Sequence, residues 1–211
     1  MRLIQKVGIY CIYTSMLVHC FSCQMPKPSK NFESFLLSEM TITDLETSYR
    51  KGSFTVRKIV ELYLDRIEKI DKNGPELNSI IIVNPEALKI ADSLDQILKL
   101  GNQKGVLFGV PVLLKDNINT NDKMPTTAGS RVLANSFPTS DSWVAKKLRE
   151  SGAVIIGKTN LSEWANYRAS FSSSGWSGIG GQTKNPYVLD RNPCGSSSGS
   201  GVAVSANLCI V

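Results

Sequence analysis

Apolar residues recur with a helical period in the first third of the chain. Thr41 precedes one periodic stretch, Asp44 follows three residues later as in a capping box, and Gly52 ends the stretch. Ser53 is then expected to cap a longer helix. The apolar positions of that helix recur every three or four residues, at Val56, Ile59, Val60, Tyr63, Ile67 and Ile70. The pattern predicts two amphipathic helices, the second ending at the Asn-Gly-Pro sequence of residues 73–75.

Short apolar runs alternate with helical patterns in the rest of the chain. The runs predict buried strands at residues 79–83, 108–117 and 153–160. The helical patterns predict a helix that opens at Asn84-Pro85, a helix over 140–152 and a short helix over 161–166. Loops rich in glycine and serine are expected at 170–185 and 190–201, before a helix or strand of small residues begins at Val202. Alternating helices and buried strands predict an α/β fold.

The first residues of the chain carry a different pattern. Arg2 and Lys6 precede an uncharged, mostly apolar stretch over residues 7–23. This stretch is shorter than the about 20 apolar residues that span a bilayer, and its basic start is typical of a secretory signal peptide. We therefore expect an exported protein. The predicted organisation is a signal peptide at 1–23, a linker at 24–40 and a folded domain at 41–211.

The end of the predicted signal suggests a lipid anchor. Ser22 and Cys23 resemble the end of a bacterial lipoprotein signal, in which Cys23 would carry the lipid. Cys20 departs from that pattern, because an aliphatic residue is usual at its position. A plain cleaved signal and a weak anchor helix are the alternatives. The expected location is the periplasm, or the membrane surface as an anchored lipoprotein.

Composition and charge exclude several classes of chemistry. The net charge of +6 is scattered along the chain without a basic cluster, so nucleic acid is not an expected partner. The single histidine, His19, lies in the predicted signal, so the folded domain cannot build a histidine-based triad or metal site. Cys194 and Cys209, the cysteines outside the signal, are too few for a disulfide framework or a zinc site. No metal and no cofactor are expected.

Lys115 is the first candidate for chemistry. It follows the apolar residues of the predicted strand over 108–117. A lysine at the tip of a buried strand loses water, which lowers the pKa of its amine and allows the neutral amine to act as a base. The alternatives are a lysine that extends to the surface and one that pairs with Asp116.

The glycine- and serine-rich sequence over 195–199 is the second candidate. Read by composition, Gly-Ser-Ser-Ser-Gly is a flexible linker or turn. Its hydroxyls and backbone N–H groups also suit a tight turn that binds an anion, although no lysine follows as in a phosphate-binding loop. A serine can act as a nucleophile without histidine if a neutral lysine accepts its proton through a second hydroxyl.

Three longer sequences resemble the amidase signature family: GVPVLLKDN, GAVIIGKTNLSEWAN and NPCGSSSGSGVAVSAN. The ordered pattern SEWAN, SGWS, GGQTKNP and PCGSSSGSG is especially similar to its peptide-amidase-like branch. The resemblance extends from about Thr41 to Val211. It implies a mixed β-sheet core flanked by helices, incomplete in this chain, and hydrolysis of carboxamides by a Ser–cis-Ser–Lys triad.

The resemblance assigns roles to particular residues. The lysine of the family falls on Lys115, its cis-serine on Ser196, and Ser197 is a supporting hydroxyl. Cys194 and Ser198 replace two glycines of the family pattern. The nucleophilic serine of the family and its oxyanion hole would lie beyond the last residue. We therefore expect an N-terminal fragment that is inactive by itself.

The expected function is that of an amidase acting on a small-molecule or peptide amide, including C-terminal amides of peptides. The loop over 168–181 would form a wall of the substrate pocket with Trp176 as an apolar face, or serve as a structural loop with a packed tryptophan. The alternatives are an amidotransferase component of the A type, which shares the family core, and a non-catalytic remnant of the fold. An export signal argues against the amidotransferase, because tRNA is cytosolic.

Overall fold

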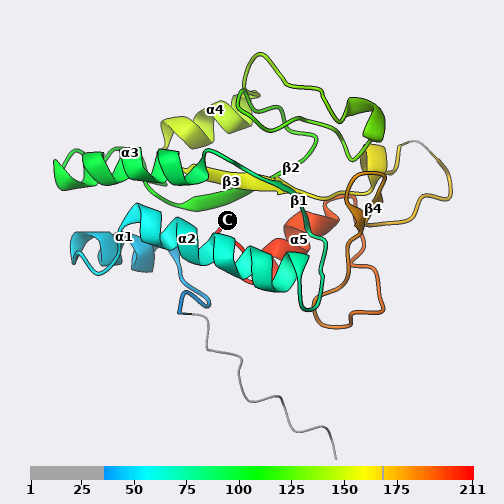
Figure 1. Cartoon of the computed structure of the whole chain (residues 1–211), viewed down its shortest axis with the longest axis horizontal. Helices are drawn as coiled ribbons and strands as arrows, with labels where there is room; N and C mark the ends of the chain where they lie inside the picture. The colour runs from blue at the N-terminus through cyan, green and yellow to red at the C-terminus, as the bar shows by residue number, and fades with distance from the viewer. Residues whose placement is uncertain (1–35, 168) are drawn as a thin grey trace, which may run out of the picture. The chain divides into compact units, whose positions relative to one another are not determined.

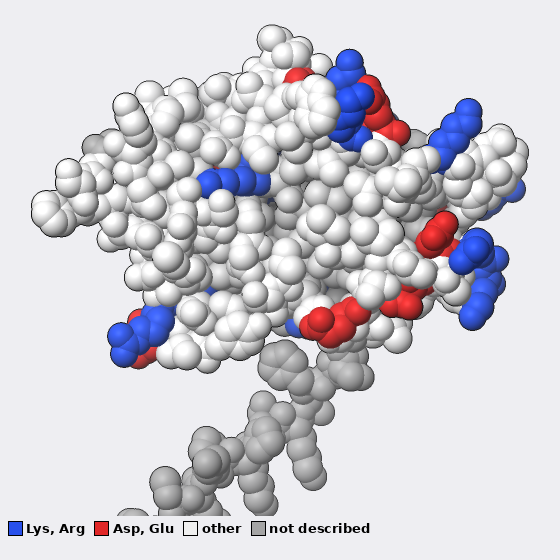
Figure 2. All heavy atoms as spheres, turned by 180° about the vertical axis from the view of Figure 1, so that it is seen from behind, with Lys and Arg blue, Asp and Glu red and all other residues white. Residues whose placement is uncertain are grey.

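The computed structural model describes residues 36–167 and 169–211 (Figure 1). The predicted signal peptide, Cys23 and most of the predicted linker lie outside these residues. Within the described part of the chain, no helix combines the length and the hydropathy that a membrane span requires. The face in Figure 2 carries basic and acidic side chains near one another along its rim, and its described residues form no continuous basic patch.

A three-stranded mixed sheet lies at the centre of the fold. The strand order is β1 (Ile80–Val83), β3 (Val154–Thr159) and β2 (Pro111–Lys115), with β1 antiparallel and β2 parallel to β3. Every residue of β3 is buried, which explains the apolar sequence of its first half, and the buried residues include the polar Lys158 and Thr159. The three strands lie within the three predicted runs, and the α/β class with a mixed sheet is confirmed.

Helices lie on both sides of the strands. In the view of Figure 1, α1 (Ile42–Arg50), α2 (Val56–Arg66) and α5 (Ser198–Ser205) lie below the strands, whereas α4 (Trp143–Glu150) lies above them. The helix α3 (Ala87–Lys99) packs against α2 and β3. Four of the apolar positions predicted for this helix, Val56, Ile59, Val60 and Tyr63, are buried in one stripe of α2 that faces the core. The other two lie in the turn that follows α2, where Ile67 is buried and Ile70 is half-buried.

The N-terminal caps of the first two helices differ in how well the sequence predicts them. The capping box of α1 is confirmed, since the Thr41 hydroxyl accepts from the Asp44 N–H (3.1 Å) and the Asp44 carboxylate accepts from the Thr41 N–H (3.1 Å). The prediction of Ser53 as the cap of α2 is wrong. Thr55 caps this helix by accepting from the Lys58 N–H (3.1 Å), because the helix begins two residues later than predicted.

The second half of the chain departs further from the prediction. The helix α5 begins at Ser198, inside the predicted loop over 190–201, because its first residues dock against the end of β3. The segment after α5 lies beside β2, where the Leu113 N–H donates to the Val211 carbonyl (3.1 Å).

Short elements occupy parts of two predicted helices and of the predicted loops. The predicted short helix over 161–166 is the 3-10 turn η3 (Glu163–Asn166), made irregular by Trp164 and Ala165 with φ of 52° and 54°. The other short elements are the π-helical turn η1 (Ile67–Lys72), the 3-10 turn η2 (Arg131–Leu133) and the two-stranded sheet of β4 (Trp176–Ser177) and β5 (Gly181–Gln182).

A buried carboxylate on α3 completes the start of α2. Asp95 accepts from the backbone N–H groups of Val56 (2.7 Å) and Arg57 (3.0 Å), two donors that the first turn of a helix leaves without partners. Asp95 is 8% exposed although it lies on a surface-type helix. It therefore joins two helices that sequence periodicity treats as independent.

We predict that Asp95→Ala lowers the free energy of unfolding by about 1–3 kcal/mol, because it leaves buried donors unpaired. Asp92→Ala is the matched control on the same helix. Asp92 pairs with Arg57 (2.6 Å), but both side chains are substantially exposed, so this loss should stay below about 1 kcal/mol. Urea unfolding of the two variants measures both values, and equal losses would contradict the prediction.

Candidate active site

The structure brings the three residues singled out by the sequence into contact. Lys115 is the last residue of β2, after four fully buried residues, and its own side chain is half-buried. Its Nζ donates to the Ser196 Oγ (2.8 Å) and to the Ser197 Oγ (2.9 Å). An amine and two hydroxyls from distant parts of the chain therefore form one hydrogen-bonded group.

Burial acts directly on the amine of Lys115. Loss of water lowers the pKa of Lys115, because the charged form is the better solvated one. The neighbouring carboxylate of Asp116 does not turn toward this amine. It accepts from the backbone N–H groups of Thr127 (3.2 Å) and Gly129 (3.2 Å) and from the Thr127 hydroxyl. The alternative of a Lys115–Asp116 pair is thus wrong, and the amine is directed at the serines.

The turn that carries the serines is held by close backbone approach. The Gly195–Ser196 peptide bond is cis. A Cβ on Gly195 would lie 2.4 Å from the Ser162 Oγ and 2.7 Å from the Ser198 Oγ, so a side chain here would displace both hydroxyls. The Ser196 carbonyl accepts from the Ser162 N–H (3.0 Å). These contacts make the sequence over 195–199 a fixed turn, and the flexible-linker alternative is wrong.

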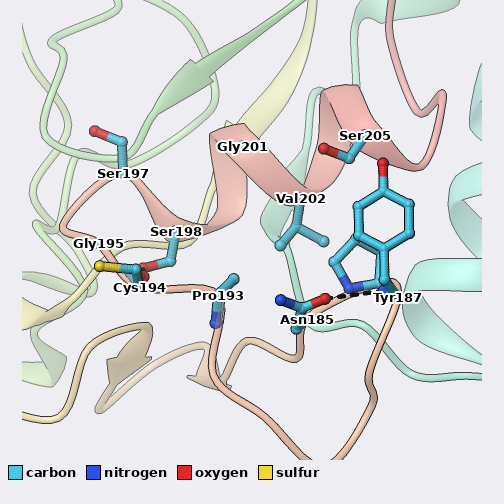
Figure 3. Close-up of a pocket in the computed structure, with 11 residues that line it drawn as sticks. Asn185, Tyr187, Pro193, Cys194, Gly195, Ser197, Ser198, Gly201, Val202 and Ser205 are labelled. Atoms are coloured by element: carbon cyan, nitrogen blue, oxygen red, sulfur yellow. Dashed lines mark hydrogen bonds between the residues drawn. The ribbon is translucent and has the colours of Figure 1, made fainter.

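A pocket of about 400 Å³ adjoins this turn (Figure 3). It lies between one face of α5, formed by Ser198, Gly201, Val202 and Ser205, and residues 185–187, 193–195 and 197. In Figure 3 the Ser197 hydroxyl points away from Tyr187 and Val202. Lys115 is not among the lining residues. The pocket therefore reaches the serine turn at Ser197, whereas Lys115 and Ser196 are not part of its lining.

A second pocket of about 320 Å³ lies beside the loop that follows η3. Its lining residues are Glu163, Ala169, Phe171, Ser172, Ser173 and Trp176. Trp176 is 44% exposed, so its ring is only partly packed against the chain. The loop is tied to the serine turn, because the Gly175 N–H donates to the Ser162 Oγ (2.9 Å). The loop around Gly175 and the serine turn thus share Ser162 as a common hydrogen-bond partner.

The chain matches the family model described as Amidase over residues 58–211. It belongs to the amidase family. Over 83% of its length it superposes with a TM-score of 0.81 on the native peptide amidase of Stenotrophomonas maltophilia, with 47% identity and 36% of that chain covered.

Curated relatives agree with this assignment. A probable amidase of Arabidopsis thaliana is 48% identical over 84% of this chain. The A-type component of the glutamyl-tRNA(Gln) amidotransferase of Alkaliphilus metalliredigens is 40% identical over 81% of it. The match covers 35% and 33% of the two relatives. The chain thus spans about a third of the length of the amidases that it resembles.

Sequence reasoning missed a fully buried lysine in this chain. Lys158 is fully buried in β3, and its Nζ donates to the Pro125 carbonyl (3.0 Å) and to the Thr126 hydroxyl. Burial lowers the pKa of Lys158, while the charge of Asp116 opposes this change. The available signal was a lysine directly after the apolar residues 153–157, inside the predicted strand over 153–160.

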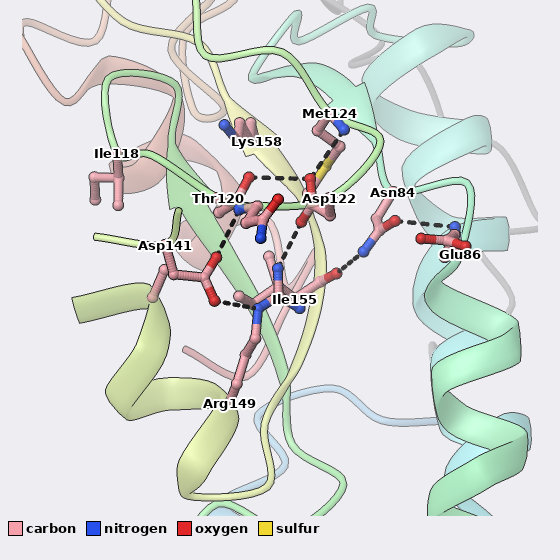
Figure 4. Close-up of polar contacts among 12 residues, drawn as sticks. Asn84, Glu86, Ile118, Thr120, Asp122, Met124, Asp141, Arg149, Ile155 and Lys158 are labelled. Atoms are coloured by element: carbon pink, nitrogen blue, oxygen red, sulfur yellow. Dashed lines mark hydrogen bonds and ion pairs between the residues drawn. The ribbon is translucent and has the colours of Figure 1, made fainter. Parts of the chain in front are cut away.

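Lys158 supports the loop that follows β2. Arg149 of α4 also contacts this loop and the residues before α4. It pairs with Asp122 (2.6 Å) and Asp141 (3.1 Å), as Figure 4 shows. Within the described residues, no group of three or more His, Cys, Asp or Glu side chains is placed to hold a metal ion.

We predict that Lys115 reacts as an amine of lowered pKa. Competitive acetylation by trace acetic anhydride, followed by peptide mass spectrometry across pH, should place its midpoint below that of N-acetyl-lysine amide in the same solution. The reason is the burial that disfavours its charged form. A midpoint equal to or above that of the model compound would contradict the prediction.

Proposed function

We propose that this chain carries the lysine and the relay serine of an amide-bond hydrolase that uses a Ser–cis-Ser–Lys mechanism. The observation that carries the proposal is the 2.8 Å contact between the Lys115 Nζ and the Ser196 Oγ. Membership in the amidase family and the similarity to a peptide amidase support it. Ser197 supports the amine through its own hydroxyl, at 2.9 Å.

The proposed mechanism moves one proton along the hydroxyls. Neutral Lys115 accepts a proton from Ser196, and Ser196 accepts one from a nucleophilic serine, which we place in the part of the amidase domain that follows this chain. That serine attacks the amide carbonyl while backbone N–H groups stabilise the oxyanion. The relay then returns the proton to the leaving amine, and water hydrolyses the acyl-enzyme. By this proposal the 211-residue chain alone is inactive.

The proposed substrate is a small-molecule or peptide amide. A similar peptide amidase is known in complex with the competitive inhibitor chymostatin, which supports an amide of a peptide C-terminus as the first choice. Trp176 and the exposed Phe171 would supply the apolar wall for the group next to the amide. Export to the periplasm, with or without a lipid on Cys23, remains part of this proposal.

The similarity to an amidotransferase component of the A type favours one alternative function. In that case the same lysine and serine would release ammonia from glutamine for transfer to a tRNA-bound acid. The predicted export signal favours the hydrolase, because charged tRNA is cytosolic. The two functions use different amides, so the substrate distinguishes them.

We predict that Lys115→Ala in a complete amidase domain lowers kcat for ammonia release from a peptide amide by about 10²–10⁴-fold, the usual contribution of a general base. Lys115→Arg should be equally inactive, since arginine keeps the charge but does not lose its proton. Lys146→Ala, at a side chain that is 65% exposed, is the control and should leave kcat unchanged.

Three other results would contradict parts of the proposal. Full activity of Lys115→Ala would exclude the relay. Ammonia release from glutamine but not from peptide amides would favour the amidotransferase alternative. A folded complete domain that hydrolyses neither amide would favour a non-catalytic remnant.

A further inference from the structure

The hydroxyl of Thr159 lies next to Lys115 in the sheet. Thr159 is the residue of β3 paired with Lys115 of β2, so the two side chains leave the sheet at the same place. Thr159 is completely buried. Its Oγ1 lies 2.7 Å from the Ser200 Oγ in the first turn of α5. A pair of hydroxyls therefore joins the strand beside the lysine to the helix that follows the serine turn.

These hydroxyls also connect to the backbone of β2. The Thr159 hydroxyl is directed at the carbonyl of Leu114 (3.4 Å), the residue before Lys115. Either hydroxyl can be the donor in the shorter contact between Thr159 and Ser200. The sequence of contacts thus extends from α5 through Thr159 to the backbone that carries the lysine.

A backbone contact presses the same turn of α5 against β3. The Gly199 N–H donates to the Asn160 carbonyl (2.9 Å). A Cβ on Gly199 would lie 2.2 Å from the Ser79 carbonyl oxygen and 2.6 Å from the Asn160 backbone, so no side chain fits between helix and strand. The backbone contact sets how close α5 comes. The two hydroxyls then restrict how the helix can slide or rotate on the strand.

The lysine and the serines lie on different elements, so the distance between them depends on how the first turn of α5 packs against β3. Ser196 and Ser197 immediately precede α5, whereas Lys115 ends β2. A displacement of about 1 Å between reacting groups can cost about 10²-fold in rate. A small shift of the first turn of α5 would therefore break the contacts of 2.8 and 2.9 Å to the amine.

We propose that Thr159 and Ser200 are positioning residues, whose hydroxyl contact holds the turn of Ser196 and Ser197 within hydrogen-bond distance of the Lys115 amine. This inference rests on the proposed function, since it assigns a role within the same lysine–serine group. Neither hydroxyl is a hydrogen-bond partner of the Lys115 amine. Their effect is on geometry, and it should appear in kcat more than in KM.

Thr159→Val tests this inference in a complete amidase domain, because valine keeps the shape of threonine and removes the hydroxyl. We expect kcat to fall about 10- to 100-fold with a change in KM of less than about twofold. Thr159→Ser keeps the hydroxyl and should restore most of kcat. Ser200→Ala should reproduce Thr159→Val, and the double variant should be no worse than either, because both remove one contact.

Ser205→Ala is the matched control, an exposed serine on the same helix that should leave kcat unchanged. Unchanged kcat in folded Thr159→Val, or equal loss in Thr159→Ser and Thr159→Val, would overturn the inference. If circular dichroism shows that Thr159→Val does not fold, Ser200→Ala replaces it in the kcat measurement, because Ser200 is only half-buried and its loss should disturb folding less. Lys115→Ala in the same assay distinguishes failure of the proposed function from failure of this inference. If Lys115→Ala stays active, the proposed function is wrong. If Lys115→Ala is inactive while Thr159→Val and Ser200→Ala keep full kcat, only the positioning role is wrong.

Discussion

The arrangement depends on holding a partly desolvated amine against two hydroxyls from a distant part of the chain. Lys115 and Ser196 are separated by 81 residues, yet their side-chain atoms lie 2.8 Å apart. The strand β2 supplies a rigid support, because β3 pairs with it on one side and the segment after α5 contacts it on the other. A side chain at the tip of such a strand extends beyond the sheet while losing much of its water, which lowers the pKa of the amine.

Backbone proximity makes the serine turn a fixed element and not a linker. Gly195 and Gly199 lie where a Cβ would meet other atoms at 2.2–2.7 Å, against Ser162 and Ser198 in one case and Ser79 and Asn160 in the other. The same composition in a solvated segment would give a flexible chain. Here the missing side chains let the turn and the helix start approach the sheet, and the serines between the glycines then point in defined directions.

Polar groups in the interior stabilise the loops around this turn. Lys158, Asp116 and Arg149 each satisfy backbone or side-chain partners in the segment over 116–141, so the long connection after β2 is ordered without regular structure. Asp95 joins α2 to α3 in the same way. Buried polar groups of this kind are costly unless they are paired, so they fix particular contacts where apolar packing would allow several.

The sequence by itself determined the features that depend on neighbours a few residues away. The period of the apolar positions located the helices and strands, the capping box located the start of α1, and the abrupt end of an apolar run pointed to Lys115. Only the tertiary structure decided that Thr55 caps α2, that α5 begins at Ser198, and that Thr159 lies beside the lysine. Glycine and serine have the same composition in a linker and in a docked turn, and a hydroxyl partner 41 residues away leaves no local period. Contacts between distant segments exist only once the sheet has brought its strands together, because the chain alone does not state which residues become neighbours.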